Sequence, residues 1–506
     1  MCITDIFSPH DKKDSILRPH CDTEHAQKHP VSLWFLSSSY ALFIFAYAAI
    51  NTLLVLYTTH KLNFKTSDAY SLFAAFNALV FTSPLAGGYI AEKFGYKNSA
   101  FMGLIFSALG AFVMTSHGLY SFYIGLALFT SGYGICTPAF FCLVGFSYHK
   151  NDSRRESGYT LFYLLFNIGS VTASVSAGYI SLYLNYYSAF ACAGIALVIA
   201  VLILLMANKK ITSHPERQMS EEPGFLKLKP SGAIAFFSIV LTPLIMFLFA
   251  YPTINNALLW FLVIAATIIV SMLAIKQPSL KARLKLFAFM LLTIISIVFW
   301  ALYMLEASLM TIFAEHNVNR YVFHHVIPPS VFYALDPAGV IIFGILLSWL
   351  WRYLAKRKKN PSLPAKFSLS MIFIGIGYIV FAIGILAAKE THLINLLWIV
   401  FGYVFLTIAE LLLVPIGLSM VGQLSPRGKE GSLMGVWTLF SGFGAIISGY
   451  LANFTTTSKI TLPSITNPTY LKYFLLFGGV SILAGLITAC FIPKIRKLIE
   501  SRGAHV

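Results

Sequence analysis

The sequence has few charged residues: Asp, Glu, Lys and Arg make up 11% of its 506 residues, whereas hydrophobic residues make up 58%. Soluble domains carry about a quarter charged residues, so a water-soluble fold of this chain would expose much apolar surface. The scarcity of charge predicts a membrane protein and argues against a soluble enzyme. Aromatic residues reach 15%, which suits helices that face lipid and its interfaces.

Acidic residues are scarcer still, 19 against 36 Lys and Arg, which leaves a net charge of +17. Most of the basic residues lie in short loops between apolar stretches, which is the orientation signal of a membrane protein. We therefore expect a lipid bilayer around this chain and no nucleic-acid partner.

Cysteine is also rare, and the six present are scattered without metal-ligand spacing. They predict neither a disulfide framework nor a metal site, and we expect no metal and no cofactor. The residues up to about Pro30 are polar and lack an apolar core followed by a cleavage site, so we expect no removable signal peptide.

Long apolar stretches, about fourteen in number, are what the sequence has in abundance. Each is close to the 20 residues that cross a hydrocarbon core, and such spans are helical because lipid offers the backbone no hydrogen-bond partner. They begin near Leu33, Ala69, Asn98, Leu119, Gly158, Tyr187, Ala233, Ala257, Leu286, Val331, Phe367, Ile394, Gly431 and Tyr470.

Basic residues alternate along these loops, and the alternation places both termini in the cytoplasm. A charged connector precedes two of the spans, which gives a 6+2+6 arrangement of two packed halves with two extra helices. The predicted segments are an N-terminal tail (1–31), a six-helix half (32–208), a connector (209–232), two extra helices (233–278), a second six-helix half (279–495) and a C-terminal tail (496–506).

Several motifs resemble known transporters. The loop GYIAEKFGYK at 88–97 resembles a signature of the major facilitator superfamily. Two longer stretches resemble one family within it, the proton-dependent oligopeptide transporters: DSRRESGYTLFYLLFNIG at 152–169 and ELLLVPIGLS at 410–419, the latter followed by SPR at 425–427 and GVW at 435–437. Shorter matches are FWALY at 299–303 and FYALDP at 332–337. The resemblance implies an all-α polytopic membrane protein with the major facilitator fold.

The first half departs from this family. The family carries an acid-x-x-acid-Arg pattern on helix 1, and Tyr40, Phe43 and Ile44 occupy those places. A helix 4 lysine of the family falls on Thr137, and a further helix 1 arginine falls on Asn51. The chain therefore lacks the charged residues that, in relatives, couple protons and bind a peptide carboxylate.

Three acidic residues remain inside spans, where an ionisable side chain is costly and is a functional candidate by default. Glu410 matches the position that engages the peptide amino group in relatives, although a protonated glutamate bonded to a neighbouring helix is the alternative. Glu306, in the outer part of the seventh family helix, is either a proton carrier or a packing residue. Asp336 precedes a proline, and we favour an N-cap over a proton-coupling role.

Other positions match residues that line the peptide site in relatives or lie on the same helix face. The alternative to a substrate-binding role is an interhelical hydrogen bond for Asn167 and Ser441 and ordinary packing for Trp437. The candidate substrate-binding residues are Glu410, Asn167, Trp437, Ser441, Tyr47 and Tyr163, the proton-coupling candidates are Glu410, Glu306 and Asp336, and the gating or topology charges are Glu92, Lys93, Arg154 and Arg155.

These residues predict a secondary active transporter that takes up small peptides or amine-bearing solutes together with protons, by alternating access. The missing cations favour an amine-bearing solute, since a buried carboxylate needs a cationic partner. The alternative is a non-transporting sensor or scaffold with a transporter fold. An enzyme is not expected, because no nucleophile motif or phosphate-binding glycine loop is present. The loop charges fit a bacterial inner membrane.

Overall fold

The computed structural model describes most of the 506 residues. The described residues are 28–149, 152, 154–211, 229–388, 392–426, 429–456 and 462–500, with side chains as far as residue 495. The predicted tails (1–31 and 496–506) and the connector (209–232) lie largely outside these residues, as do the loop cations Lys150 and Arg427.

The described residues are almost all helical, as expected of a chain that satisfies its backbone groups within lipid. The helices are α1 (Val31–His60), α2 (Thr66–Phe94), α3 (Tyr96–Val113), α4 (Leu119–Phe146), α5 (Arg155–Tyr183), α6 (Tyr186–Met206), α7 (Pro230–Ala250), α8 (Pro252–Ile275), α9 (Leu280–Tyr303), α10 (Leu309–Asn317), α11 (Leu335–Lys356), α12 (Leu363–Ala387), α13 (Leu396–Leu424), α14 (Glu430–Phe454) and α15 (Pro463–Glu500).

Thirteen helical segments in the described part of the chain are long and apolar enough to cross a membrane. The fourteenth predicted span is α3, which has 18 residues and carries the polar side chains of Lys97 and Asn98 in its first turn. It packs along α4 within the same bundle. The predicted all-α membrane architecture is therefore confirmed.

One connection is more elaborate than a simple loop. Between α9 and α11 the chain forms the short helix α10, a small antiparallel hairpin of β1 (Tyr321–Val322) and β2 (His325–Val326), and the 3-10 helix η4 (Pro329–Ala334). The η4 segment leads directly into α11, so Asp336 lies in the first turn of that helix.

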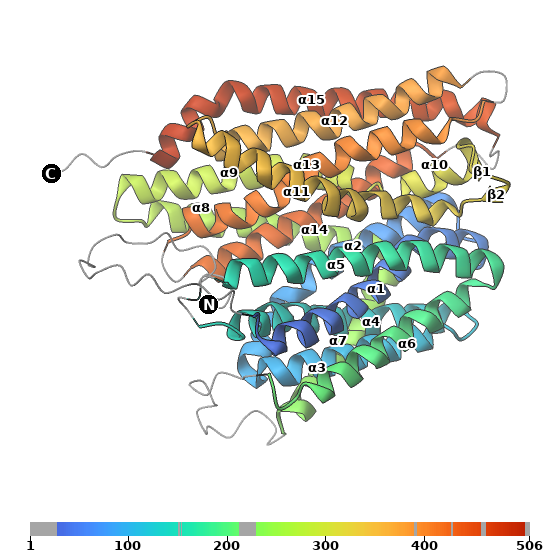
Figure 1. Cartoon of the computed structure of the whole chain (residues 1–506), viewed down its shortest axis with the longest axis horizontal. Coiled ribbons are helices and arrows are strands. Elements are labelled where there is room, and N and C mark those ends of the chain that lie inside the picture. Colours follow the sequence, from blue (N-terminus) through green and yellow to red (C-terminus); the bar gives the residue numbers. More distant parts are fainter. Residues whose placement is uncertain are drawn as a thin grey trace.

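The helices form two neighbouring groups. In the first group, α1 packs against α5 and α6, and α3 against α4; in the second group, α12 packs against α13 and α15. The groups meet where α2 contacts α14 and where α5 contacts η4 and α11. Of the two extra helices, α7 packs on α2, α3 and α4, and α8 on α9 and α14 (Figure 1).

The bundle has two ends, which we name by the chain. The terminal end is where α1 begins and α15 ends, and the distal end carries α10 and the β1–β2 hairpin (Figure 1). Lys93, Lys209, Lys276 and Arg352 all lie near the ends of helices at the terminal end. The basic residues of these loops thus share one end of the bundle, as their alternation along the chain predicts.

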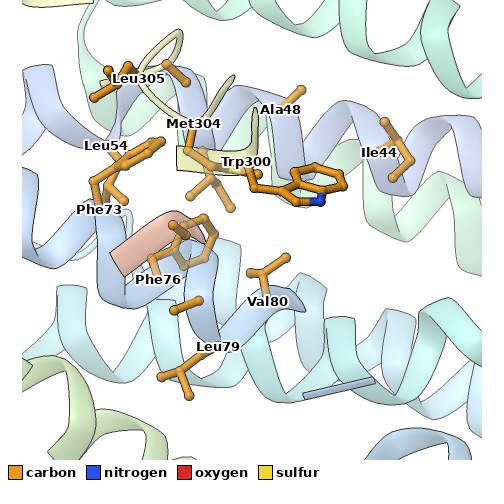
Figure 2. Packing of buried hydrophobic residues seen from close by; sticks show 14 of the residues in the cluster. Ile44, Ala48, Leu54, Phe73, Phe76, Leu79, Val80, Trp300, Met304 and Leu305 are labelled. Carbon is orange, nitrogen blue, oxygen red and sulfur yellow. The ribbon is translucent and has the colours of Figure 1, made fainter. Parts of the chain in front are cut away.

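Near the distal end, apolar side chains fill the space between the two groups. Figure 2 shows Trp300 and Met304, from α9 and the turn after it, lying close to Phe73 and Phe76 of α2. The rings of Trp300 and Phe81 are 5.6 Å apart. All but Phe81 of these side chains are buried, so the two groups are packed closed on this side of the bundle.

Small residues allow helices to approach closely within each group, as is usual in membranes. Gly169 of α5 lies so close to α1 that a Cβ atom at this position would be 2.3 Å from the backbone oxygen of Ala41. Only a glycine fits at this crossing, which fixes the distance between α1 and α5.

Candidate functional site

Four charged side chains are buried in the described part of the chain: Glu306, Asp336, Glu410 and Lys366. Lys366 is the fourth residue of α12 and lies near the terminal end, with its Nζ 4.4 Å from the centre of the Trp351 ring. The three acids belong to the second helix group. The buried charge deeper in the bundle is thus acidic, as the sequence predicts.

Asp336 has two firm hydrogen bonds. The Tyr303 hydroxyl of α9 donates to Oδ2 over 3.0 Å, and the Thr407 hydroxyl of α13 donates to Oδ1 over 3.0 Å. The side chain is 2% exposed, so these two donors replace the water that a carboxylate would otherwise bind. Asp336 therefore ties α11 to two neighbouring helices.

The N-cap interpretation of Asp336 is wrong. The residue that caps α11 is Ala334, which has no side-chain capping bond, because the preceding 3-10 turn of η4 runs directly into the helix. The Leu335 amide bonds to the Phe332 carbonyl of η4, so the helical path is continuous at this point. The Asp336 carboxyl bonds instead to side chains of α9 and α13.

Glu410 is held more loosely. It lies in the middle of α13, and its Oε1 accepts a long hydrogen bond of 3.5 Å from the Tyr163 hydroxyl of α5. Its Oε2 is buried and has no hydrogen-bond partner among the described residues. Because Tyr163 belongs to the first helix group, this contact joins the two groups at the centre of the protein. Asp336 lies within interaction range of the same carboxyl.

Glu306 lies in a turn, not in the outer part of a membrane helix as predicted. Helix α9 ends at Tyr303, and the Glu306 amide bonds to the Tyr303 carbonyl over 3.1 Å, an i to i+3 contact that breaks the α-helical pattern. The side chain is 1% exposed, and neither carboxyl oxygen has a hydrogen-bond partner among the described residues. Glu306 is thus the most isolated of the three acids.

Tyrosines from both helix groups surround these acids. Tyr163 interacts electrostatically with Glu410 and Asp336, and Tyr303 and Tyr333 interact with all three acids. Tyr333 also interacts with Tyr47 of α1. The acids and the phenol groups therefore form one polar cluster at the interface between the two groups, with hydroxyls that can donate to a carboxylate or accept from an ammonium.

In the first group, neutral side chains occupy the positions at which the family resemblance led us to expect charges. The Tyr47 hydroxyl donates to Asn77 Oδ1 over 2.9 Å, and Asn77 Nδ2 donates to Asn51 Oδ1 over 3.0 Å. Tyr40 is buried in an aromatic cluster, with its ring centre 4.8 Å from that of Phe162 and 5.2 Å from that of Phe140. Aromatic rings therefore fill the space around this part of α1.

Of three other predicted residues, Asn167 contacts this cluster through Tyr163, whereas the contacts of Ser441 and Trp437 lie elsewhere. The Asn167 amide donates to the Tyr163 carbonyl in its own helix over 2.9 Å, and the Ser441 hydroxyl donates to the Trp437 carbonyl over 3.1 Å. Trp437 is buried against Gly417 of α13 and faces the Phe367 ring, 6.2 Å away. These contacts agree with the alternative interpretation of Trp437 as a packing residue.

The predicted gating charges lie at the terminal end. Arg154 donates to both carboxyl oxygens of Asp152, at 3.0 and 2.7 Å, and to the Lys28 carbonyl at 2.8 Å. These hydrogen bonds lower the pKa of Asp152 to about 2. Glu92 and Lys93 lie exposed at the end of α2, and Arg155 begins α5. These charges lie at the ends of α2 and α5, whereas Glu410 lies in the middle of α13.

A comparison with protein families decides the identity of this fold. The model of the POT family matches residues 97–468. The chain belongs to the POT family. Dipeptide and tripeptide permease B of Yersinia enterocolitica is similar, with 29% identity over 91% of this chain and 94% of the permease. The permease of the same name from Salmonella typhimurium is 28% identical over 91% of this chain and 94% of its own length.

Solved structures of this family share the fold. A peptide transporter POT in complex with sulfate has a TM-score of 0.81 and 24% identity, and covers 93% of this chain and 96% of its own. A POT family transporter in complex with 5-aminolevulinic acid has a TM-score of 0.79 and 22% identity, and covers 92% and 97%. The family resemblance and the fold predicted from the sequence are thus confirmed.

Two of the hydrogen-bonding partners in the acidic cluster were not predicted. Thr407 carries no signal in the sequence, since one threonine in an apolar helix is common. Tyr303 stands in the FWALY match at 299–303, but only the fold shows that its hydroxyl reaches Asp336. A search for hydroxyl residues one or two helical turns from each membrane acid would have selected both as candidates.

Proposed function

We propose that this POT family protein is a proton-coupled secondary transporter that takes up small peptides or amine-bearing solutes by alternating access. The observation that carries the proposal is the acidic cluster at the interface between the two helix groups, which has no buried Lys or Arg beside it among the described residues. A buried acid must be neutralised by a proton or by a cation, and a transport cycle can use both.

Glu410 is the proposed contact of the substrate ammonium group. Its Oε2 has no hydrogen-bond partner among the described residues, and its Oε1 accepts the long hydrogen bond from Tyr163. Asp336 and Tyr303 lie within interaction range of the same carboxyl. An ammonium would therefore pair with a buried oxygen that otherwise lacks a donor. Tyr163 lies 37% exposed at the same place, and its ring face can pack against the bound solute.

A substrate carboxylate finds no comparable partner in the described part of the site. The positions that carry charges in relatives are filled by Tyr40 and its aromatic neighbours, and Asn51 is paired with Asn77. Burying a carboxylate without a cation is unfavourable. We therefore expect amine-bearing solutes, or peptides whose carboxyl group is modified, to bind better than ordinary dipeptides.

Glu306 and Asp336 are the proposed proton-coupling residues, together with Glu410. Glu306 lies without hydrogen-bond donors in an apolar environment, where its neutral form is the one that is cheap to bury. It lies in the turn after α9 at which Met304 packs against α2 of the first group (Figure 2), so a rocking motion would change its exposure. Asp336, held by two hydroxyls, is expected to keep its position during that motion.

The relatives support the peptide or amine class of substrate. Two are dipeptide and tripeptide permeases, and one solved family member is in complex with 5-aminolevulinic acid. A location in a bacterial inner membrane, with the terminal end on the cytoplasmic side, agrees with the basic loops at that end.

Uptake by the purified protein in liposomes tests this proposal. We expect an inward proton gradient to drive accumulation of a labelled dipeptide amide, which keeps its free amine and has no carboxylate, and we expect Glu410→Gln to abolish it. Glu156→Gln is the matched control, because Glu156 is an exposed glutamate in the first turn of α5. If dialanine competes for uptake as well as its amide does, the proposed preference for solutes without a free carboxylate is wrong.

A non-transporting sensor or scaffold is the second candidate, favoured by the absence of charged residues in the middle of α1. It predicts that no peptide or amine crosses the membrane and that Glu410→Gln changes no flux. Ligand-induced stabilisation of the protein without any flux would support it.

A further inference from the structure

A pair of ionisable side chains joins the two helix groups at the distal end. Nε2 of His60, the last residue of α1, lies 3.2 Å from Oε1 of Glu315 in α10. The other ring nitrogen, Nδ1, lies 2.9 Å from the hydroxyl of Tyr186, the first residue of α6. The imidazole is thus oriented by the first group while it contacts an acid of the second.

Glu315 is the less exposed partner, with 15% of its side chain accessible against 40% for His60. Its Oε2 lies 3.6 Å from Nε2 of His316, and Arg320 donates to the Glu315 backbone carbonyl over 3.2 Å. Arg320 also donates to the Ile327 carbonyl over 2.9 Å, which anchors the hairpin segment to α10.

The charged and titratable neighbours of the pair come from every helix packed around it. Lys61 follows His60, Tyr186 belongs to α6, and His316 and Arg320 flank Glu315 in the chain. Further out, Tyr70 of α2 and Tyr470 of α15 lie within electrostatic range of Glu315 and of one another.

The pair lies where the two groups are already packed together. Trp300 and Met304 fill the space between α9 and α2 deeper in the bundle, as Figure 2 shows. This apolar packing has no dependence on protonation, whereas the His60–Glu315 contact does. We call the region between the two groups at the distal end the distal mouth. The His60–Glu315 pair is a titratable contact across this mouth.

We propose that His60 and Glu315 form a latch that holds the distal mouth closed, and that the pH of the compartment at this end sets the strength of the latch. The latch concerns the closed arrangement of the two groups and does not depend on which solute the protein carries.

Two titrations bound the pH range of the latch. Burial works to raise the pKa of Glu315, but the hydrogen bond from His60 and the nearby charges of His60, His316 and Arg320 outweigh burial and hold its pKa below the ordinary value of 4.5. A depressed acid pKa stabilises the closed form at pH values above the ordinary one, and this contribution is lost as the pH falls through the lowered value.

The upper bound comes from the imidazole. A histidine ring loses its charge as the pH rises, and the contact then becomes a hydrogen bond between a neutral ring and a carboxylate, which is weaker than the ion pair. The latch is therefore strongest in mildly acidic medium and loosens as the pH rises through the neutral range.

Distances between the distal ends of the two groups test this inference. Spin labels at cysteines that replace the exposed Leu184, just after α5, and Leu397, at the start of α13, report the opening. The background has all native cysteines replaced. We expect one short distance at pH 6 and an open population that grows about threefold to tenfold at pH 8.5, as suits a partly exposed ion pair.

Variants separate the latch from a general effect of pH. His60→Gln and Glu315→Gln should show the larger open population already at pH 6, whereas His60→Lys, which keeps its charge, should stay closed at both pH values. His324→Gln is the matched control, since His324 is an exposed histidine of the distal hairpin. Thermal unfolding confirms that each variant is folded.

The inference is overturned if the parent protein shows the same distances at pH 6 and 8.5. It is also overturned if His60→Gln and Glu315→Gln keep the parent distances and pH response. Because no substrate or flux is measured, this failure is distinct from a failure of the proposed transport function.

Discussion

Removing a hydroxyl that donates to Asp336 should destabilise the protein, and the two donors should act together. Tyr303→Phe and Thr407→Val each delete one hydrogen bond of 3.0 Å and leave the shape of the side chain almost unchanged. Asp336 is 2% exposed, so water cannot replace the lost donor.

The expected size follows from these contacts. Side-chain hydrogen bonds within membranes contribute about 0.5 to 2 kcal/mol, and a carboxyl acceptor puts these two near the upper end. We expect about 1 to 2 kcal/mol for each variant. The double variant should lose more than the sum, because the buried carboxyl then has no hydroxyl donor from α9 or α13. Tyr163→Phe is the matched comparison, since its bond to Glu410 is 3.5 Å long, and it should cost less than about 0.5 kcal/mol.

Thermal unfolding of the purified protein in detergent, followed by tryptophan fluorescence, provides the measurement. An unfolding entropy of about 2 cal/mol/K per residue over 506 residues gives about 1 kcal/mol/K, so 2 kcal/mol lowers the midpoint by about 2 °C. Equal effects of Tyr163→Phe and Thr407→Val, or strict additivity in the double variant, would refute the assignment of Asp336 as the doubly bonded acid.

Two further predictions concern the first helix group. Gly169→Ala should lower the unfolding midpoint and the yield of folded protein, because a Cβ atom would lie 2.3 Å from the Ala41 carbonyl oxygen; an unchanged midpoint would show that α1 and α5 can separate without cost. Tyr40→Glu introduces an acid at the position where the sequence resemblance implies one. It should reduce folded yield and should not improve dipeptide binding, since the surrounding Phe140 and Phe162 rings offer a carboxylate no partner. Stronger dipeptide binding by Tyr40→Glu, measured by calorimetry, would contradict this account of the aromatic cluster.

The membrane helices could be read from the sequence because their signal is local. An apolar stretch of about 20 residues must become a helix in lipid whatever surrounds it, so nearly every span near a predicted start, such as Leu119 or Leu286, is a helix. The exception is the region near Val331, where a 3-10 turn precedes α11. Its sequence is as apolar as a helix, and composition does not distinguish the two.

The acids of the site were also found from the sequence, since a carboxyl inside an apolar span stands out. Their surroundings were not. The N-cap interpretation of Asp336 failed because the continuation of η4 into α11 depends on how α5 and α10 pack around it. The placement of Glu306 in a helix failed because the end of α9 is set by backbone contacts that an apolar sequence does not reveal.

The sequence by itself determined that this chain is a helical membrane protein of the POT family with acids and no cations at mid-membrane depth, because hydrophobicity and motif identity are local properties of the chain. The tertiary structure alone decided that Tyr303 and Thr407 bond to Asp336, that Tyr163 reaches Glu410, and that His60 meets Glu315 across 255 positions of the chain. Such partners lie far apart in sequence, and only the packing angles of the helices bring them within hydrogen-bond distance.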